Sequence, residues 1–166
     1  MPKTKDLYID IGAASKAAAE DKVSLGDYGV FDSAVVEFGD GLIKAKAIDD
    51  RVGCAALLKL IEDEPPIDTW FCFTVQEEVG LRGAASMAYA LDPGFAMVLE
   101  GTTAADLAEV EGGKAVCRVR GGVVLPFMDG ATIYDAELFE LLRNACDKRG
   151  IRWQTKTRVA GGTDAG

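Results

Sequence analysis

The chain has 166 residues, 49% of them hydrophobic, with 18 Lys and Arg against 27 Asp and Glu, which gives a net charge of −9. This length and composition suit one domain with a hydrophobic core and argue against two full domains. The acidic balance, without any basic cluster, argues against nucleic acid as a partner. No apolar run approaches the roughly 20 residues of a membrane span, and the first residues lack a signal-peptide core, so we expect a cytoplasmic protein without a membrane partner.

The sequence contains no histidine. Catalysis by serine or cysteine with an imidazole base is therefore excluded within this chain. Cys54, Cys72, Cys117 and Cys146 are far apart and show no CxxC or zinc-finger spacing. We expect them to be buried free thiols in a reducing compartment. Any acid–base chemistry must come from carboxylates.

The opening part of the chain is predicted to be rich in β-structure. A strand over residues 6–13 precedes a short helix over 15–22, for which Ser15 is the expected N-cap. Short strands separated by turns follow at 28–31, 34–38 and 42–48.

From residue 51 the predicted elements alternate between helix and strand. Helices are expected at 51–63, 82–91 and 135–150. Strands are expected at 69–75, 95–100, 115–119, 122–126 and 151–157. This alternation predicts an α/β fold, a three-layer sandwich around a mixed or parallel sheet. We expect Trp70 and Phe73 to lie in its core.

Acidic residues follow four of the predicted strands. Asp49 and Asp50 come after strand 42–48, Glu77 and Glu78 after 69–75, and Glu100 ends 95–100. The GGTDAG segment, with Asp164, follows strand 151–157. Ligands bind beyond the carboxyl ends of parallel strands, where several unpaired carboxylates would require cations. Oxygen ligands suit divalent metals, and a free carboxylate beside them could act as a base, as in a two-metal hydrolase. Neighbouring residues on an extended chain point to opposite sides, so one glutamate of the pair would bind metal and the other would move a proton.

Five ordered strings carry a resemblance to a known family. The chain resembles the dinuclear-metal (co-catalytic) aminopeptidases that include glutamyl aminopeptidase and the tetrahedral aminopeptidases, some of which are named endoglucanase. The strings are 45-AKAIDDRVGCAALLKLIE-62, 73-FTVQEEVGLRGA-84, 98-VLEGTTAAD-106, 127-FMDGATIYD-135 and 153-WQTKTRVAGGTDAG-166. The resemblance implies a zinc-peptidase-like fold, a peptide substrate, and two divalent ions, zinc or cobalt.

The resemblance also implies roles for individual residues. Asp49 would bridge the two metals, Glu78 and Glu100 would each bind one metal, and Glu77 would be the general base that takes a proton from the attacking water. The expected activity is the removal of N-terminal residues from peptides.

Residues around these ligands are assigned by the same resemblance. A cis peptide bond is implied between Asp49 and Asp50, and Asp50 and Arg51 would orient the bridging carboxylate. Thr163 and Asp164, in the GGTDAG loop, would line the pocket floor.

The family pattern also contains two metal-binding histidines, one in a GHxDE-type segment and one after GGTDAG, and this chain has neither. We therefore expect both metals to be bound more weakly, or not to be retained. Residues 1–40 resemble the last part of an inserted β-rich dimerisation domain, and 41–166 resemble part of the catalytic domain. The chain thus resembles the middle half of a longer protein. We expect a homo-oligomer, with a complementing chain that supplies histidines as a second candidate partner.

Two other functions remain open at this point. The chain could be a non-catalytic module for assembly or for binding peptides or metals. Alternatively, paired carboxylates also serve glycoside hydrolases, which a chelator would not inhibit.

Overall fold

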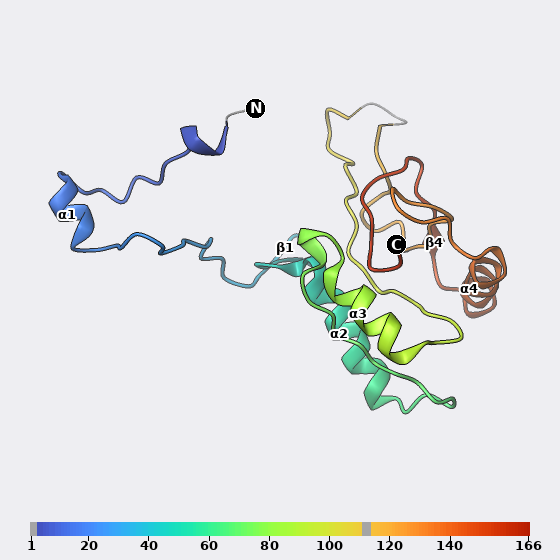
Figure 1. Cartoon of the computed structure of the whole chain (residues 1–166). Coiled ribbons are helices and arrows are strands. Elements are labelled where there is room, and N and C mark those ends of the chain that lie inside the picture. The colour runs from blue at the N-terminus through green and yellow to red at the C-terminus, as the bar shows by residue number, and fades with distance from the viewer. Residues whose placement is uncertain (1–2, 111–113) are drawn as a thin grey trace. The chain divides into compact units, whose positions relative to one another are not determined.

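The structure is a computed structural model that describes residues 3–110 and 114–166 (Figure 1). The chain divides into two compact units, one that ends at Lys46 and one that runs from Ala47 to Gly166. We call them unit 1 and unit 2. None of the helices in the described ranges has the length and apolar character needed to cross a membrane.

Unit 1 contains little regular structure. Its elements are η1 (Thr4–Asp6), α1 (Lys16–Glu20), β1 (Val36–Phe38) and β2 (Leu42–Lys44). The predicted cap of α1 is confirmed, because Ser15 Oγ accepts a hydrogen bond from Ala18 N at 3.2 Å. β1 and β2 form an antiparallel hairpin in which Phe38 faces Leu42. The predicted strands at 6–13 and 28–31 are absent, since neither segment finds a ladder partner among the described residues.

Unit 2 holds most of the regular structure. Its elements are α2 (Ile48–Glu62), η2 (Glu77–Val79), α3 (Arg82–Leu91), β3 (Val123–Val124), α4 (Ala136–Arg149) and β4 (Trp153–Gln154). The prediction of α3 agrees with its observed bounds, and α4 lies within the predicted range. Asp135 Oδ1 caps α4 by accepting from Leu138 N at 2.8 Å, and Gly150 ends the helix with φ 64°. α2 begins earlier than predicted and is kinked in its first turn at Asp49 and Asp50, whose backbones are not helical.

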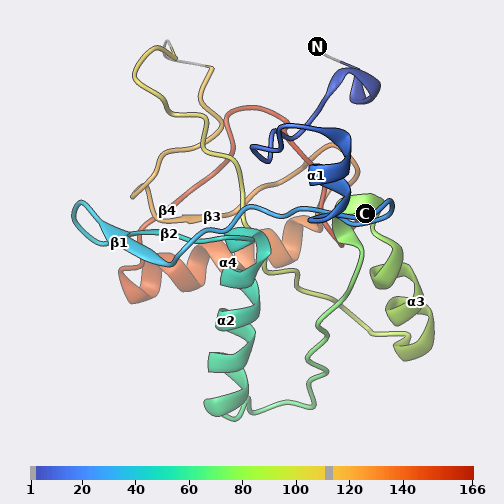
Figure 2. The same cartoon turned by 90° about the vertical axis from the view of Figure 1, so that its left-hand side faces the viewer.

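β3 and β4 pair in parallel, as an α/β fold requires, with Val123 opposite Trp153. Figure 2 shows α4 running along this pair. The rings of Phe139 and Trp153 make an edge-to-face contact, with centroids 6.5 Å apart, and Trp153 Nε1 donates to Asp147 Oδ1 at 2.9 Å. Aromatic packing and one hydrogen bond therefore hold α4 against β4.

The predictions of strands at 69–75, 95–100 and 115–119 are wrong for this structure. Trp70 is 74% exposed and Phe73 is 45% exposed, so neither belongs to the core. A strand needs a neighbour to pair with, and the described residues supply none for these segments. The buried hydrophobic residues are few: Ala115, Val116, Cys117, Leu125 and Cys146. All four cysteines are free, and only the last two are buried, whereas Cys54 and Cys72 are partly exposed.

Candidate metal centre

Three carboxylates gather where α2 begins. Asp49, Asp50 and Glu100 each offer an oxygen, and these oxygens lie within 4.8 Å of one another. Two of the residues come from the kinked first turn of α2, and the third comes from the end of segment 95–100. Segments about 50 residues apart in the sequence thus meet at one acidic cluster.

Asp50 ties these two segments together. Its Oδ1 accepts hydrogen bonds from Gly53 N and from Gly101 N, each at 3.0 Å. Gly101 N also approaches Glu100 Oε1, at 3.1 Å. The peptide bond between Asp49 and Asp50 is cis, which confirms the expectation from the resemblance. The backbone bonds connect Asp50 to both segments, while its role in orienting the bridging carboxylate stays a prediction.

Two glycines permit this close approach. A Cβ on Gly53 would lie 2.1 Å from Asp50 Oδ2 and 2.7 Å from Leu99 O. A Cβ on Gly101 would lie 3.1 Å from Asp49 Oδ1. The sequence analysis did not identify either residue as part of the site. The available signal was a glycine inside a predicted helix, which often marks close packing of the backbone.

Glu77 faces the same cluster from η2. Gln76 and Leu81, on either side of η2, have φ of 61° and 58°, a conformation that costs energy for residues other than glycine and that is common near functional sites. Glu77 is half-buried, whereas Glu78 is exposed. Burial, and then the charges of Glu78 and of carboxylates elsewhere in unit 2, raise the pKa of Glu77. Those other carboxylates are Asp164, Asp49 and Asp50.

The cluster carries a concentrated negative charge. Burial, the charge of Asp50 and a hydrogen bond to Asp49 together raise the pKa of Glu100 to about 7. Burial also raises the pKa of Asp50, although its bonds from Gly53 N and Gly101 N oppose the change. Oxygen ligands that repel one another are the donor set that a divalent cation would neutralise, so these residues fit such an ion.

The structure brings most, but not all, of the predicted site residues together. Asp49, Asp50 and Glu100 form the cluster, and the charges of Asp49, Asp50 and Asp164 act on Glu77. Glu78 is in the same short helix as Glu77 but outside the three-carboxylate group, and Arg51 is exposed.

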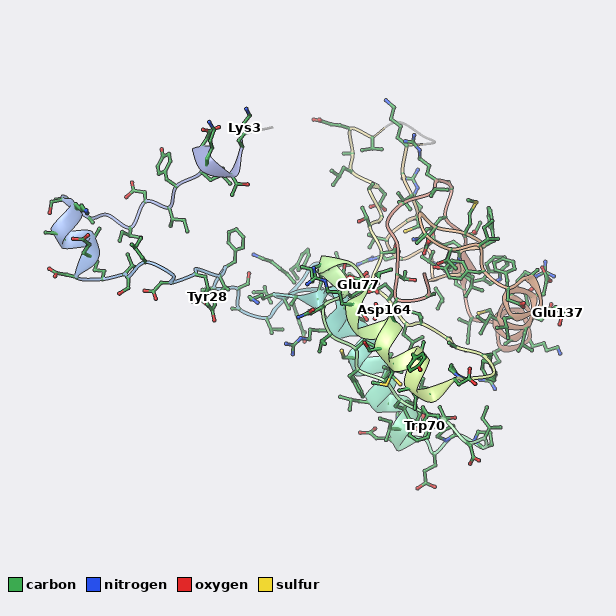
Figure 3. All side chains as sticks on the ribbon, in the orientation of Figure 1. Lys3, Tyr28, Trp70, Glu77, Glu137 and Asp164 are labelled. Carbon is green, nitrogen blue, oxygen red and sulfur yellow. The ribbon has the colours of Figure 1, made fainter. Side chains whose placement is uncertain are left out.

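The GGTDAG loop lies at the end of the chain. Thr163 is buried, and one carboxylate oxygen of the neighbouring Asp164 accepts a hydrogen bond from the Thr74 hydroxyl. Figure 3 labels Glu77 and Asp164 in unit 2. Thr74 precedes Glu77 by three residues, so the bond joins the loop to the segment that carries Glu77.

Comparisons with solved structures identify the fold. The structure resembles that of an aminopeptidase from the archaeon Desulfurococcus kamchatkensis, with a TM-score of 0.87 and 36% identity over 99% of this chain. It also resembles a TET aminopeptidase from a Thaumarchaeota archaeon, with a TM-score of 0.85 and 34% identity over 99% of this chain. Each match covers 48% of the other chain. The fold is therefore that of an aminopeptidase.

The sequence comparison identifies the family. The model of the M42 glutamyl aminopeptidases matches residues 1–166, and the chain therefore belongs to that family. A putative aminopeptidase from Acetivibrio thermocellus is 37% identical over 96% of this chain, and the glutamyl aminopeptidase of Lactococcus lactis is 30% identical over the whole length of this chain. The chain spans about half the length of these relatives, 48% and 47% respectively.

Proposed function

We propose that the protein represented by this chain is a dinuclear metalloaminopeptidase that removes N-terminal residues from peptides. The observation that carries the proposal is the group of Asp49, Asp50 and Glu100 within 4.8 Å, with Glu77 close enough for the charges of Asp49 and Asp50 to contribute to its raised pKa. Membership of an aminopeptidase family supports the reaction class. The cluster is the feature that ties this chemistry to particular residues.

Each acidic residue has a distinct proposed role. Asp49 would bind both of two divalent ions, zinc or cobalt, while Glu78 and Glu100 would each bind one ion. When bound, the ions would supply Lewis-acid activation of the scissile carbonyl and of water. Glu77 takes the proton from the attacking water and gives it to the leaving amine, and its raised pKa suits a group that must both accept and donate.

The surrounding residues hold this arrangement. Asp50 fixes the start of α2 against Gly101 and so orients Asp49. We assign the same orienting role to Arg51. Thr163 and Asp164 form the pocket floor, and Thr74 keeps the Asp164 carboxylate in place. In the intact protein, we propose, residues 41–166 are part of a three-layer catalytic domain, and residues 1–40 belong to an inserted dimerisation domain.

The exposed apolar surface supports a role for partners. The chain exposes 13535 Å² for a mass of 17.6 kDa, against about 7,900 Å² expected for a folded monomer of that mass. In unit 2 the unpaired segments 69–75 and 95–100 contribute Val75 at 67% and Phe95 at 58% exposure. We propose that further polypeptide pairs with these segments, either a complementing chain with the metal-binding histidines or other copies. One similar structure, PhTET1-12s, is a dodecamer.

A calorimetric titration tests the metal site. The metal-stripped chain is titrated with Co²⁺ or Zn²⁺, in parallel with Asp49→Asn and with Asp68→Asn, an exposed acidic residue of unit 2 that serves as the matched control. We expect micromolar or tighter binding that is lost only in Asp49→Asn. Equal binding by all three proteins would show that the cluster is not the site.

Activity assays then separate the functions. EDTA-sensitive release of the N-terminal residue from a peptide, abolished in Glu77→Gln without loss of metal binding, would support the proposal. Activity on cellulose that survives EDTA would favour a glycoside hydrolase. A chain that binds no metal and turns over neither substrate would be a binding or assembly module.

A further inference from the structure

Segment 127–135 carries a buried carboxylate for which the mechanism above has no role. Asp129 is 4% exposed. Its Oδ1 accepts from Ala131 N at 2.7 Å and from Thr132 N at 2.8 Å, and its Oδ2 accepts from the Tyr134 hydroxyl at 2.5 Å. A buried carboxylate with both oxygens bonded has a fixed orientation, so it also fixes the direction of the Tyr134 O–H bond.

Tyr134 also forms a hydrogen bond with the GGTDAG loop. Its single hydroxyl proton goes to Asp129, so at 3.3 Å its oxygen can only accept from the Thr163 hydroxyl. Thr163 is 8% exposed, and its Oγ1 in turn accepts from Ala165 N at 3.2 Å. The three hydrogen bonds therefore all point the same way, with each donor facing the next acceptor from Ala165 to Asp129.

A backbone bond joins the same two segments. Gly130 N donates to Gly161 O at 2.8 Å. A Cβ on Gly130 would lie 2.6 Å from that oxygen, so a larger residue would push the segments apart. Segment 127–135 therefore contacts the loop at two points, through backbone at Gly161 and through side chain at Thr163.

The loop held in this way carries Asp164. One Asp164 oxygen accepts from the Thr74 hydroxyl, whereas the other, Oδ1, is buried and has no hydrogen-bond partner. The charge of Asp164 also acts on Glu77. A buried carboxylate oxygen without a hydrogen-bond partner, close to other negative charges, is energetically unfavourable. Other contacts must therefore hold Asp164 in this position.

We propose that Tyr134 is a positioning residue: anchored on buried Asp129, its hydroxyl fixes Thr163 and thereby holds in place the loop whose Asp164 carboxylate accepts from Thr74, in the segment that leads to Glu77. The use of this positioning in catalysis rests on the proposed function. The positioning itself depends only on the hydrogen bonds described. Tyr134 touches neither substrate nor metal in this scheme. It acts through Thr163 and Asp164.

Amide hydrogen exchange on the full chain tests the positioning. Tyr134→Phe removes only the hydroxyl, and we expect exchange at Ala165 N and Gly130 N to become about tenfold faster, with α4 unchanged. Thr163→Val should reproduce this pattern, and Thr163→Ser, which keeps a hydroxyl, should restore slow exchange. The matched control is Tyr89→Phe, since Tyr89 is 92% exposed. Unchanged exchange at Ala165, or faster exchange throughout unit 2, would overturn the proposal.

A double-mutant cycle with Co²⁺ alone as the probe tests the link to the cluster. Asp164→Asn removes one negative charge and should weaken Co²⁺ binding by about fivefold. Tyr134→Phe should weaken it by a similar or smaller factor, and the double variant should bind no more weakly than Asp164→Asn. If the losses of Co²⁺ affinity in the two single variants multiply in the double variant, Tyr134 does not act through Asp164. If the wild-type chain binds no Co²⁺, the proposed metal site fails, and hydrogen exchange alone decides the role of Tyr134.

Discussion

The stability of the metal-free chain should fall as the pH rises, because Glu100 carries a raised pKa. Burial, the charge of Asp50 and a hydrogen bond to Asp49 raise this pKa from 4.5 to about 7 in the folded state. Between these values the folded chain holds a proton that the unfolded chain has released. The contribution to stability is therefore complete below pH 4.5 and is lost as the pH rises through 7.

The expected size of the effect follows from the same shift. A difference between 4.5 and about 7 corresponds to at most about 3.4 kcal/mol in the free energy of unfolding. Glu100 is only partly buried, and solvent screening reduces this to roughly 1 to 2 kcal/mol. Glu100→Gln cannot ionise, so its stability should exceed that of the wild type by less than this amount at pH 5 and by the full amount at pH 8.

The assay is urea unfolding with EDTA present, followed by tryptophan fluorescence. Trp70 and Trp153 are the only tryptophans, and both lie in unit 2 with the cluster. The matched control is Glu109→Gln, an exposed glutamate of the same unit. If the gap between Glu100→Gln and the wild type is the same at pH 5 and pH 8, the electrostatic reasoning is refuted.

Two further predictions concern packing and helix capping. Gly53→Ala should lower the free energy of unfolding by about 1 to 3 kcal/mol, because its Cβ would overlap Asp50 Oδ2 and Leu99 O, whereas Gly94→Ala, with nothing within 4 Å, should change it little. Urea unfolding measures both, and equal effects would contradict the packing argument. Asp135→Ala should cost about 1 kcal/mol by removing the cap of α4, with a loss of helical circular dichroism on heating; an unchanged midpoint would mean that the cap contributes nothing.

Helices were predictable from the sequence because their signals are local. Asp135 and Gly150 mark the two ends of α4, and Ser15 marks the start of α1, all within a few residues of the bonds they make. Strands depend on partners that are distant in the sequence. Segments 69–75 and 95–100 have the apolar character of buried strands, yet the described residues contain no neighbour for either. Pairing, rather than propensity, decides the state of such segments.

The candidate site was predictable to a similar extent. Asp49 and Glu100 each follow an apolar run, which indicated that they would meet, and they do. Neither run is a strand at the point where it reaches its acidic residue. The supporting residues gave weaker signals. Gly53 reads as an ordinary helix glycine, and Asp129 and Tyr134 read as parts of a polar loop, since nothing in the sequence shows which backbone groups they will contact.

The acidic cluster forms at an energetic cost that backbone hydrogen bonds partly offset. Bringing Asp49, Asp50 and Glu100 together costs energy, which appears as the raised pKa of Glu100. The backbone bonds from Gly53 N and Gly101 N to Asp50 offset part of that cost and hold the oxygens close before any ion arrives. Such a site lowers the stability of the metal-free protein, but its oxygen ligands are already positioned for an ion. The bonds to Asp50 should therefore favour cation binding, and weakening them should lower both the metal-free stability at pH 8 and the affinity for Co²⁺.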